Sequence, residues 1–464
     1  MIRVTLLSGL GHTLLVAAGL LVYVLGTRIG QQRRHPSAAM AWVLGMLTFP
    51  YLTLPLFLLF GARKFVRPAR RVRVQAWQLP DGGPPWATRL LAGMELAPAV
   101  RNVRVLLHAD GAQSLQSLLA TIASARQRLD VCTYLFANDD TGRQIAQALL
   151  ERARHGVSVR LLVDAMGGIG MPGGMLRSLK RQGVQVRRFM PLLHNPLHGR
   201  VNLRNHRKLA VADGQRLWSG GRNLASEYFI DRPGRPAWID LSYEVHGPLA
   251  AQALAQFNTD WRVARGLALR KARRPHGRPS LHAPASGPLA QWVASGPDHA
   301  DDTAHALLLA AAYHAQRRIV AVTPYFVPDQ ALLDAWCLAC RRGVRVSLLL
   351  PARSNHRLAD MARERALRDL SAAGAQVWLA PAMVHAKAVL IDDDLALVGS
   401  LNLDARSLFL NYEAMTAFYG AEELRWLSQW CAGLIAKSRP YHARRPSWPR
   451  DIAEGMVRAL GFQL

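Results

Sequence analysis

The sequence predicts an α/β protein made of two pseudo-symmetric halves that share one cleft, preceded by an N-terminal hairpin of two transmembrane helices. Three observations support this prediction. Two long stretches near the N-terminus contain no acidic or basic residue other than His12. After them, helical apolar patterns alternate with short apolar runs that are typical of buried strands. This order of segments occurs twice, and each copy ends in a similar set of polar residues.

The membrane-spanning helices are predicted over residues 4–27 and 36–62. A helix needs ~20 apolar residues to cross a hydrocarbon core of roughly 30 Å, and both stretches are long enough. Pro50 and Pro55 are expected to kink the second helix, which membrane helices tolerate. The first stretch lacks a small-residue cleavage site and a second span follows it at once. A membrane helix is therefore favoured over a cleaved signal peptide.

Basic residues set the expected orientation of these helices. The loop between the two stretches contains Arg33 and Arg34, and six basic residues lie between Arg63 and Arg73. The positive-inside rule places such segments in the cytoplasm, together with both ends of the chain. The whole chain has 58 Lys and Arg against 31 Asp and Glu. This excess predicts attraction to a polyanion, either an anionic membrane surface or nucleic acid.

The two halves align through a repeated helix end and strand. "RHGVSVRLLV" at 154–163 corresponds to "RRGVRVSLLL" at 341–350, and a glycine ends the helix at the same place in both. Helices that alternate with buried strands imply largely parallel sheets covered by helices. We therefore expect five regions: the transmembrane hairpin with its basic flank at 1–75, the first half at 100–265, a basic Pro- and Gly-rich linker at 266–288, the second half at 289–440 and a C-terminal extension at 441–464.

The C-terminal extension is expected to form a helix. Ile452, Met456, Val457, Leu460 and Phe462 recur at roughly helical spacing. We expect this helix to pack on the second half, with contact to a membrane as the alternative.

Each half carries a histidine and a lysine two positions apart, in an apolar run that ends in aspartate. Residues two apart on a strand point to the same face, so an imidazole and an ammonium group lie side by side. A turn then leads to a return strand, which brings small residues and an asparagine 17 positions after the histidine. The first copy consists of His206, Lys208, Asp213, Gly220 and Asn223, and the second of His385, Lys387, Asp392, Gly399, Ser400 and Asn402.

These residue types suit the transfer of a phosphoryl-linked group without a metal. One histidine can attack phosphorus while the other protonates the departing alcohol. Lysine, asparagine and backbone N–H groups can hold the phosphate oxygens. A carboxylate beside each imidazole would orient it, and Asp240 and Glu413 are the candidates. Asp213 and Asp392 belong to the same motif and are counted with its histidines and lysines in the predicted catalytic set. Their odd offsets from the histidines nevertheless suggest a structural role at the hairpin end.

Other groups with metal-binding potential are interpreted as structural. Cys337 and Cys340 form a CxxC inside an apolar helical pattern, and no second CxxC completes a zinc site. "HNPLH" at 194–198 has no acidic or cysteine partner nearby. We therefore expect no metal and no cofactor.

Together the two copies resemble the phospholipase D superfamily, whose signature is H-x-K-x(4)-D-x(6)-G-[GS]-x-N in duplicate. Within that superfamily the chain most resembles the bacterial cardiolipin synthases. The supporting segments are "PSAAMAW", "LRNHRK", "SGPD", "TPYFVPD" and "GSLNLDARSLFLNYE". Family members often have a histidine two positions after the aspartate that matches Asp240, and here that position is Ser242.

The resemblance implies a transphosphatidylation at the bacterial inner membrane, with the catalytic part in the cytoplasm. One phosphatidylglycerol gives its phosphatidyl group to the first-copy histidine and releases glycerol, and a second phosphatidylglycerol accepts the group to form cardiolipin. The two histidine roles could be reversed, and phosphatidylethanolamine could be the donor. A hydrolytic phospholipase D uses the same motifs, with water as the acceptor. A nuclease would suit the basic charge, but two predicted membrane spans and the lack of a nucleic-acid module disfavour it.

Overall fold

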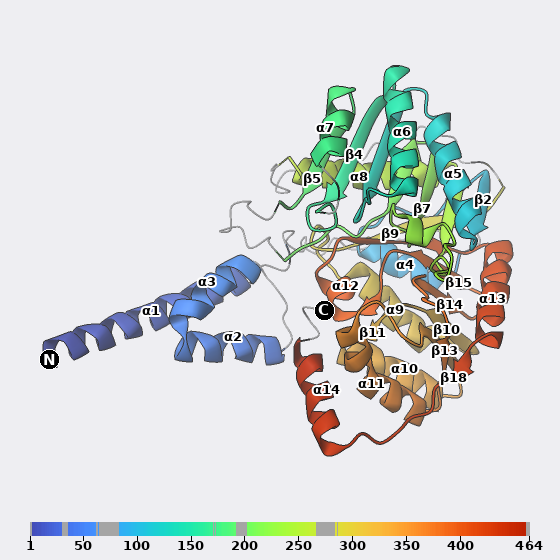
Figure 1. Cartoon of the computed structure of the whole chain (residues 1–464). Helices are drawn as coiled ribbons and strands as arrows, with labels where there is room; N and C mark the ends of the chain where they lie inside the picture. The colour runs from blue at the N-terminus through green and yellow to red at the C-terminus, as the bar shows by residue number, and fades with distance from the viewer. Residues whose placement is uncertain are drawn as a thin grey trace.

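The computed structural model describes residues 2–29, 36–61, 64, 83–169, 171, 173–191, 202–265, 284 and 286–460. Three helices project from one side of a body that contains two α/β halves, one above the other in Figure 1. The segment "HNPLH" at 194–198 and nearly all of the predicted linker at 266–288 lie outside the described residues. So do the basic residues between 63 and 73 apart from Lys64, whose Nζ lies 2.9 Å from Asp302 Oδ1.

The N-terminal helices differ from the prediction in one respect. In the described part of the chain, α1 (Ile2–Ile29) is the one helix long and apolar enough to cross a membrane, over Gly9–Thr27. The single kinked helix expected over 36–62 is wrong, because the chain forms α2 (Pro36–Thr48) and α3 (Pro50–Phe60) instead. Phe49 separates them with φ −134° and ψ 59°, since the residue before a proline is pushed out of the helical region.

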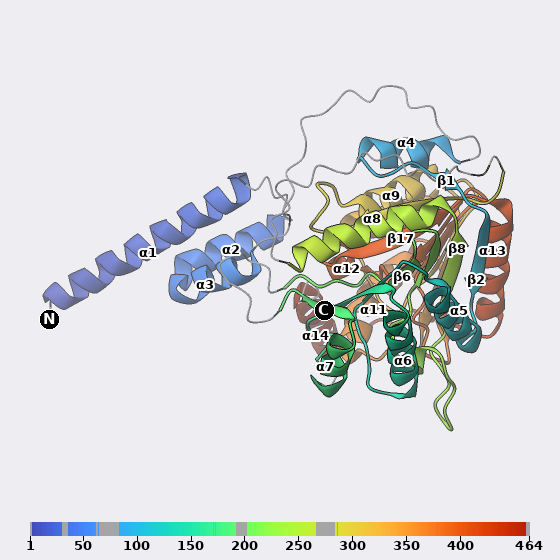
Figure 2. The ribbon, with the colours of Figure 1, turned by 90° about the horizontal axis from the view of Figure 1, so that it is seen from above.

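The α3 helix folds back along α2, and both pack against α1 (Figure 2). His12 of α1 lies beside Tyr51, with ring centroids 5.7 Å apart, and Tyr23 lies beside Phe57 at 5.4 Å. The turn at Phe49 is therefore level with the N-terminal part of α1, and the end of α3 is level with its C-terminal part. The outer faces of the three helices expose large apolar side chains, among them Leu14, Leu21, Met40, Leu44, Phe49 and Leu52.

The first half contains a seven-stranded sheet with the order β2-β8-β7-β6-β3-β4-β5. Aspartates cap two of its helices: Asp110 accepts from the backbone N–H of Gln113 and Asp139 from that of Gly142. The strands are β2 (Arg104–His108), β3 (Arg128–Thr133), β4 (Ser158–Asp164), β5 (Gln185–Phe189), β6 (Leu209–Ala212), β7 (Arg216–Gly220) and β8 (Ser242–His246). The helices are α5 (Gly111–Ser124), α6 (Asp140–Arg154), α7 (Gly173–Arg181), the 3-10 turn η2 (Ser226–Tyr228) and α8 (Pro248–Val263).

The second half repeats this order as β9-β17-β15-β14-β10-β12-β13, with β1 and β18 added at the two edges. Its strands are β9 (Leu289–Ser295), β10 (Arg318–Val322), β12 (Arg345–Pro351), β13 (Gln376–Ala380), β14 (Ala388–Ile391), β15 (Leu395–Gly399), β17 (Glu413–Phe418) and β18 (Arg439–Pro440). A separate strand pair joins β11 (Phe326–Val327) to β16 (Leu403–Asp404). The helices are α9 (Thr303–His314), α10 (Gln330–Arg341), α11 (Arg357–Ala372), α12 (Ala405–Phe409) and α13 (Ala421–Ala436).

The repeat predicted from the sequence is confirmed in the strand order of the two sheets, and the glycines after α6 and α10 adopt φ of +80° and +90°. One expectation is wrong. The sheets are mixed rather than largely parallel, because the hairpin β6–β7 returns beside β3 in antiparallel order, as β14–β15 does beside β10. At the start of the segment predicted as the first half, β1 (Val100–Arg101) pairs with β9, and α4 (Pro85–Gly93) contacts α9.

The two sheets are joined by a shared apolar core. This core contains side chains of both sheets together with α8 and α13, whereas separate cores lie under the outer helices of each half. The Tyr243 hydroxyl of the first sheet lies 2.6 Å from Thr416 Oγ1 of the second. The Tyr243 ring also meets Phe418 edge to face, with centroids 5.3 Å apart. The halves therefore form one body around the segments that carry the motifs.

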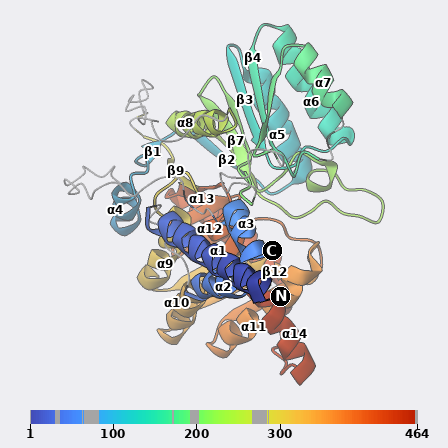
Figure 3. The same cartoon turned by 90° about the vertical axis from the view of Figure 1, so that its left-hand side faces the viewer.

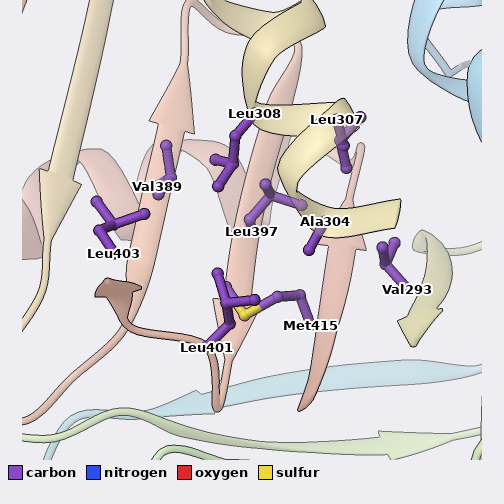
Figure 4. A pocket seen from close by; sticks show the side chains of 9 residues that line it. All are labelled: Val293, Ala304, Leu307, Leu308, Val389, Leu397, Leu401, Leu403 and Met415. Carbon is purple, nitrogen blue, oxygen red and sulfur yellow. The ribbon is translucent and has the colours of Figure 1, made fainter. Parts of the chain in front are cut away.

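A small apolar cavity lies within the second half, between α9 and its sheet (Figure 4). Apolar side chains alone line it, including Leu308, Leu397, Leu401 and Met415. Because no polar side chain lines this cavity, it is not a candidate for the active site.

Candidate active site

Both histidine–lysine pairs lie where the two halves meet, in extended segments that lead directly into β6 and β14. The side chain of His206 is 21% exposed, and His385, Lys208 and Lys387 are buried. Lys208 Nζ donates to the carbonyl oxygen of His206 at 2.7 Å. Lys387 Nζ lies 2.8 Å from His385 Nδ1 and 3.0 Å from Nε2. The Lys387 amine therefore lies against its own imidazole, whereas Lys208 is bonded to the backbone of its own histidine and acts on the His206 ring through its charge.

Each histidine also meets a carboxylate from the opposite half. His385 Nδ1 lies 2.6 Å from Asp240 Oδ2, and His206 Nδ1 lies 3.4 Å from Glu413 Oε1. Both predicted carboxylates thus lie beside a histidine, and each half supplies the carboxylate for the histidine of the other half. In both pairs Nδ1 faces the acid, so Nε2 is the ring nitrogen turned away from the carboxylate.

Backbone pairing between the halves produces this exchange. Asn205 forms a parallel bridge with Tyr412, the residue before Glu413, and Val384 forms one with Ile239, the residue before Asp240. The N–H of His206 donates to Tyr412 O at 2.9 Å, and that of His385 donates to Ile239 O at 2.7 Å. The same local geometry therefore occurs twice, once in each direction across the interface.

The surroundings shift the pKa values of the two carboxyl groups in opposite directions. Burial alone would raise the pKa of Asp240, but His385, Lys387 and Arg222 outweigh it and lower the pKa to about 2. Burial raises the pKa of Glu413 to about 7, although Lys208 opposes this. Asp240 is therefore an anion against His385, whereas Glu413 is easily protonated beside His206.

The two imidazoles are held neutral by their surroundings. Burial lowers the pKa of His206 well below 6.5, and Lys208, Arg406 and Lys387 lower it further. Burial lowers the pKa of His385 to about 4, Lys387 adds to this effect and Asp240 opposes it. A negatively charged phosphodiester between these groups would remove much of the repulsion and raise both pKa values. The site is thus built to receive an anion.

Asp213 and Asp392 lie away from the histidines, at the far ends of the two hairpins. The Asp213 carboxylate accepts from the backbone N–H groups of residues 126, 127 and 128, and Asp392 accepts from those of residues 316, 317 and 318. Both residues adopt a positive φ, +52° and +46°, which aspartate tolerates in tight turns. Their inclusion in a catalytic set is disfavoured by this geometry, which matches the alternative structural interpretation.

Gly220 and Gly399 end the return strands β7 and β15, and Ser400 and the two asparagines follow directly after them. A β-carbon on Gly220 or Gly399 would overlap the backbone oxygen of Leu241 or Ala414, so these positions admit only glycine. Ser400 Oγ donates to Glu413 Oε2 at 2.5 Å.

The two asparagines differ in their partners. Asn223 Nδ2 donates to the Tyr228 hydroxyl at 2.8 Å. Asn402 Oδ1 is buried and has no hydrogen-bond partner among the described residues. The second asparagine is therefore the one with spare hydrogen-bonding capacity.

Several residues that sequence reasoning missed complete the site. The Tyr134 ring lies 4.2 Å from the His206 ring, and the rings of Tyr228 and Trp238 lie 5.0 and 5.5 Å from that of His385. Arg406 donates to Asn202 and adds positive charge near His206. Arg406 lies in "LDARS", a segment of the resemblance, so a weak signal for it was present in the sequence.

Arg207, between the first histidine and its lysine, is fully buried and joins the halves. Its Nη1 lies 2.5 Å from Asp260 Oδ1, and its Nη2 donates to Asp298 at 3.0 Å and to Ser295 O at 3.1 Å. Its Nε donates to Glu413 O at 3.0 Å. Arg207 therefore fixes the first motif against the strand that carries its carboxylate.

Within the described residues no three His, Cys, Asp or Glu side chains are grouped so that they could hold a metal ion. Cys337 and Cys340 are free and partly buried on α10, against the core of the second half.

The family model described as "Cardiolipin synthase, PLD-like domain" matches this chain twice, at residues 118–261 and 308–435. The chain belongs to this family. Cardiolipin synthase A of Pseudomonas aeruginosa is 34% identical over 426 residues, which cover 87% of this chain and 85% of the relative. Cardiolipin synthase A of Pseudomonas entomophila is 33% identical over 400 residues, 82% of each chain. The predicted membership of the cardiolipin synthase family is confirmed.

Solved structures share the fold of this family member. Phosphatidylserine synthase from Haemophilus influenzae superimposes with a TM-score of 0.63 at 14% identity, over 82% of this chain and all of that one. Polyphosphate kinase from Porphyromonas gingivalis gives a TM-score of 0.50 at 12% identity, over 86% of this chain and 57% of that one. At these identities the likeness supports the two-half α/β architecture alone.

Proposed function

We propose that the protein is a cardiolipin synthase that joins two phosphatidylglycerol molecules and releases glycerol. The observation that carries this proposal is the pair of imidazoles, each with a lysine from its own motif and a carboxylate from the opposite half. Family membership supplies the reaction type, and the cationic site suits a phosphodiester. The proposed intermediate is a phosphohistidine.

His206 is the proposed nucleophile. The groups that act most strongly on it, burial and the charges of Lys208, Arg406 and Lys387, all lower its pKa and keep the imidazole neutral, so one ring nitrogen has a lone pair for attack. In the first step Nε2 forms a bond to phosphorus, and the bond from phosphorus to the glycerol oxygen breaks. Lys208 and Lys387 offset the negative charge that develops on the phosphate oxygens.

His385 is the proposed acid and base. Asp240, an anion 2.6 Å from its Nδ1, favours the protonated imidazole once a phosphodiester has entered. His385 then gives a proton to the departing glycerol. In the second step it takes the proton of a hydroxyl on the second phosphatidylglycerol. That oxygen bonds to phosphorus, the bond to His206 Nε2 breaks, and both imidazoles return to their starting states.

The proposed location is the bacterial inner membrane, with the two halves on the cytoplasmic side. As they stand, α2 and α3 have 13 and 11 residues and extend about 20 and 17 Å, too short to cross a core of roughly 30 Å. We therefore assign the crossing to α1 and treat α2 and α3 as a hairpin that enters the bilayer and returns. The basic residues at 33–34 and at 63–73 then lie on the same, cytoplasmic side, which satisfies the positive-inside rule for both.

Purified full-length protein in vesicles of phosphatidylglycerol, without added metal, tests the reaction. Mass spectrometry follows cardiolipin, phosphatidic acid and free glycerol. Cardiolipin that rises one-for-one with glycerol supports the proposal. Phosphatidic acid without cardiolipin would make the protein a hydrolase on the same scaffold. Turnover that appears only after phosphatidylethanolamine is added would identify that lipid as the donor.

A further inference from the structure

The C-terminal helix α14 (Trp448–Leu460) carries its apolar face outward. Trp448, Ile452 and Met456 are spaced four residues apart, so they lie on one side of the helix, and they are 78%, 46% and 65% exposed. The helix packs on α11 of the second half. Of the apolar residues that we expected to face that half, however, Ile452 and Met456 are exposed and Val457 is partly buried. A surface helix normally turns its apolar stripe to the core.

Polar contacts hold the other side of α14 to the body. The Glu454 side chain is 1% exposed, and its Oε2 accepts from Arg368 Nη2 of α11 at 2.6 Å. Arg450 of α14 donates to Glu454 Oε1 at 2.8 Å. The helix is thus fixed with its carboxylate buried and its apolar stripe free, an orientation that leaves the stripe for a partner.

The charges around the stripe indicate the kind of partner. From Arg439 to Arg450 the sequence contains five basic residues counting His442 and no acidic residue. Arg444, Arg445 and Arg450 are exposed. A tryptophan at the start of an amphipathic helix with basic neighbours is typical of a helix that lies in the interface of an anionic bilayer.

The position of α14 places a bilayer within reach. In Figure 1 it lies at the edge of the body from which α1–α3 project, and Figure 3 shows it on the face that these helices approach. A protein anchored through α1 always has a lipid surface on that side. We propose that Trp448, Ile452 and Met456 enter the interface of an anionic membrane, so that α14 is a second contact that sets the orientation of the body on the bilayer.

A fluorescent label at position 456 tests this contact directly. The full-length variant Met456→Cys, in a background with Cys337→Ser and Cys340→Ser, would carry an environment-sensitive probe in nanodiscs that contain phosphatidylglycerol and spin-labelled lipids. We expect the lipids to quench this probe several-fold more than a probe at Glu151→Cys, an exposed position on α6. Equal quenching at the two positions would overturn the proposal. Disulfide cross-linking between copies of the unlabelled Met456→Cys variant would overturn it too, in favour of a second chain as the partner.

A functional test separates this contact from the catalytic site. We expect Ile452→Glu with Met456→Glu to lower turnover several-fold on phosphatidylglycerol vesicles and to leave turnover on dispersed phosphatidylglycerol in mixed micelles unchanged. Leu338→Glu, at an exposed apolar position on α10, is the matched control. An equal loss in vesicles and micelles would contradict a role at the membrane. The quenching measurement does not depend on turnover, so it stands even if the proposed reaction is wrong.

Discussion

His206 and His385 have the same kinds of neighbours, but the carboxyl groups beside them differ in distance and in pKa. His385 faces an anion at 2.6 Å, whereas His206 faces at 3.4 Å a carboxyl group whose pKa burial raises to about 7. This difference is the physical reason for the proposed division of roles, with His206 as nucleophile and His385 as acid.

Replacing either histidine removes one of the two roles. We expect His206→Ala and His385→Ala each to lower turnover by at least about 10³-fold, since nucleophile and proton donor act in sequence. Both variants should still insert into membranes. Turnover in phosphatidylglycerol vesicles measures the effect, and His155→Ala, an exposed histidine at the end of α6, is the control. Substantial activity in either variant would break the two-histidine mechanism.

Asp213 and Asp392 should affect stability more than turnover. Each holds three backbone N–H groups, and asparagine offers only one oxygen to them, so Asp213→Asn and Asp392→Asn should each cost about 1–3 kcal/mol of stability. Thermal unfolding and turnover per folded molecule separate the two effects. Asp393→Asn, an exposed neighbour, should change neither. A loss of turnover as large as that of the histidine variants, without a change in unfolding temperature, would restore these residues to the catalytic set.

Glu413 should make stability depend on pH near neutrality. Its folded pKa of about 7 lies above the ordinary value of 4.5, so between these values the folded chain binds more protons than the unfolded chain. The stability present below pH 4.5 is therefore lost as the pH rises through 7. We expect the Glu413→Gln variant to show a weaker dependence of the unfolding temperature on pH between pH 5 and pH 7. An unchanged slope in this variant, compared with an exposed control such as Glu151→Gln, would refute the assignment.

At the scale of elements, the turn at Phe49 is the basis of the proposed membrane arrangement. If α1 crosses and α2–α3 turn back, as proposed, the N-terminus and the C-terminus lie on opposite sides of the bilayer, and not both in the cytoplasm as the sequence predicts. We expect protease added to spheroplasts to remove an N-terminal epitope tag and to spare a C-terminal one. Protection of both tags would show that residues 36–62 cross as one helix. Lysed spheroplasts, in which both tags are removed, provide the control.

The sequence predicts some elements well and others poorly, for physical reasons. The duplicated offsets of histidine, lysine and asparagine indicate two equivalent hairpins, because the spacing is set by the hairpin itself. The break at Phe49 was missed because the proline pattern of 36–62 fits a kinked helix as well as two short ones. The outward stripe of α14 was missed because periodicity shows that a face is apolar but not what it faces.

At the scale of the whole molecule, Arg207 couples the two halves. Its guanidinium group neutralises Asp260 and Asp298 in the interior, and these partners lie far from it in the sequence. Asp298 lies in "SGPD", a segment of the resemblance, but no local pattern indicates that either aspartate pairs with Arg207. The exchange of Asp240 and Glu413 between halves has the same origin, since both depend on how the sheets meet.

Removing Arg207 should therefore destabilise the whole body. Arg207→Gln leaves two buried carboxylates without their cation, which typically costs about 3–5 kcal/mol. Denaturant unfolding of the detergent-solubilised chain would measure this loss. Arg143→Gln, which breaks an exposed ion pair with Asp140, should change stability by less than about 1 kcal/mol. Equal effects of the two substitutions would contradict the coupling role.

The pairing of Asp240 and Glu413 with the histidines of the opposite halves also has a genetic consequence. A cell with one gene copy encoding His206→Ala and another encoding His385→Ala makes every side chain of the site, yet within each folded chain one imidazole is missing. Because each half completes the other through buried backbone pairing, two such chains cannot complement one another unless their halves exchange during folding. Mutations in the two copies of the motif should therefore fail to complement each other, as two mutations in a single gene normally do.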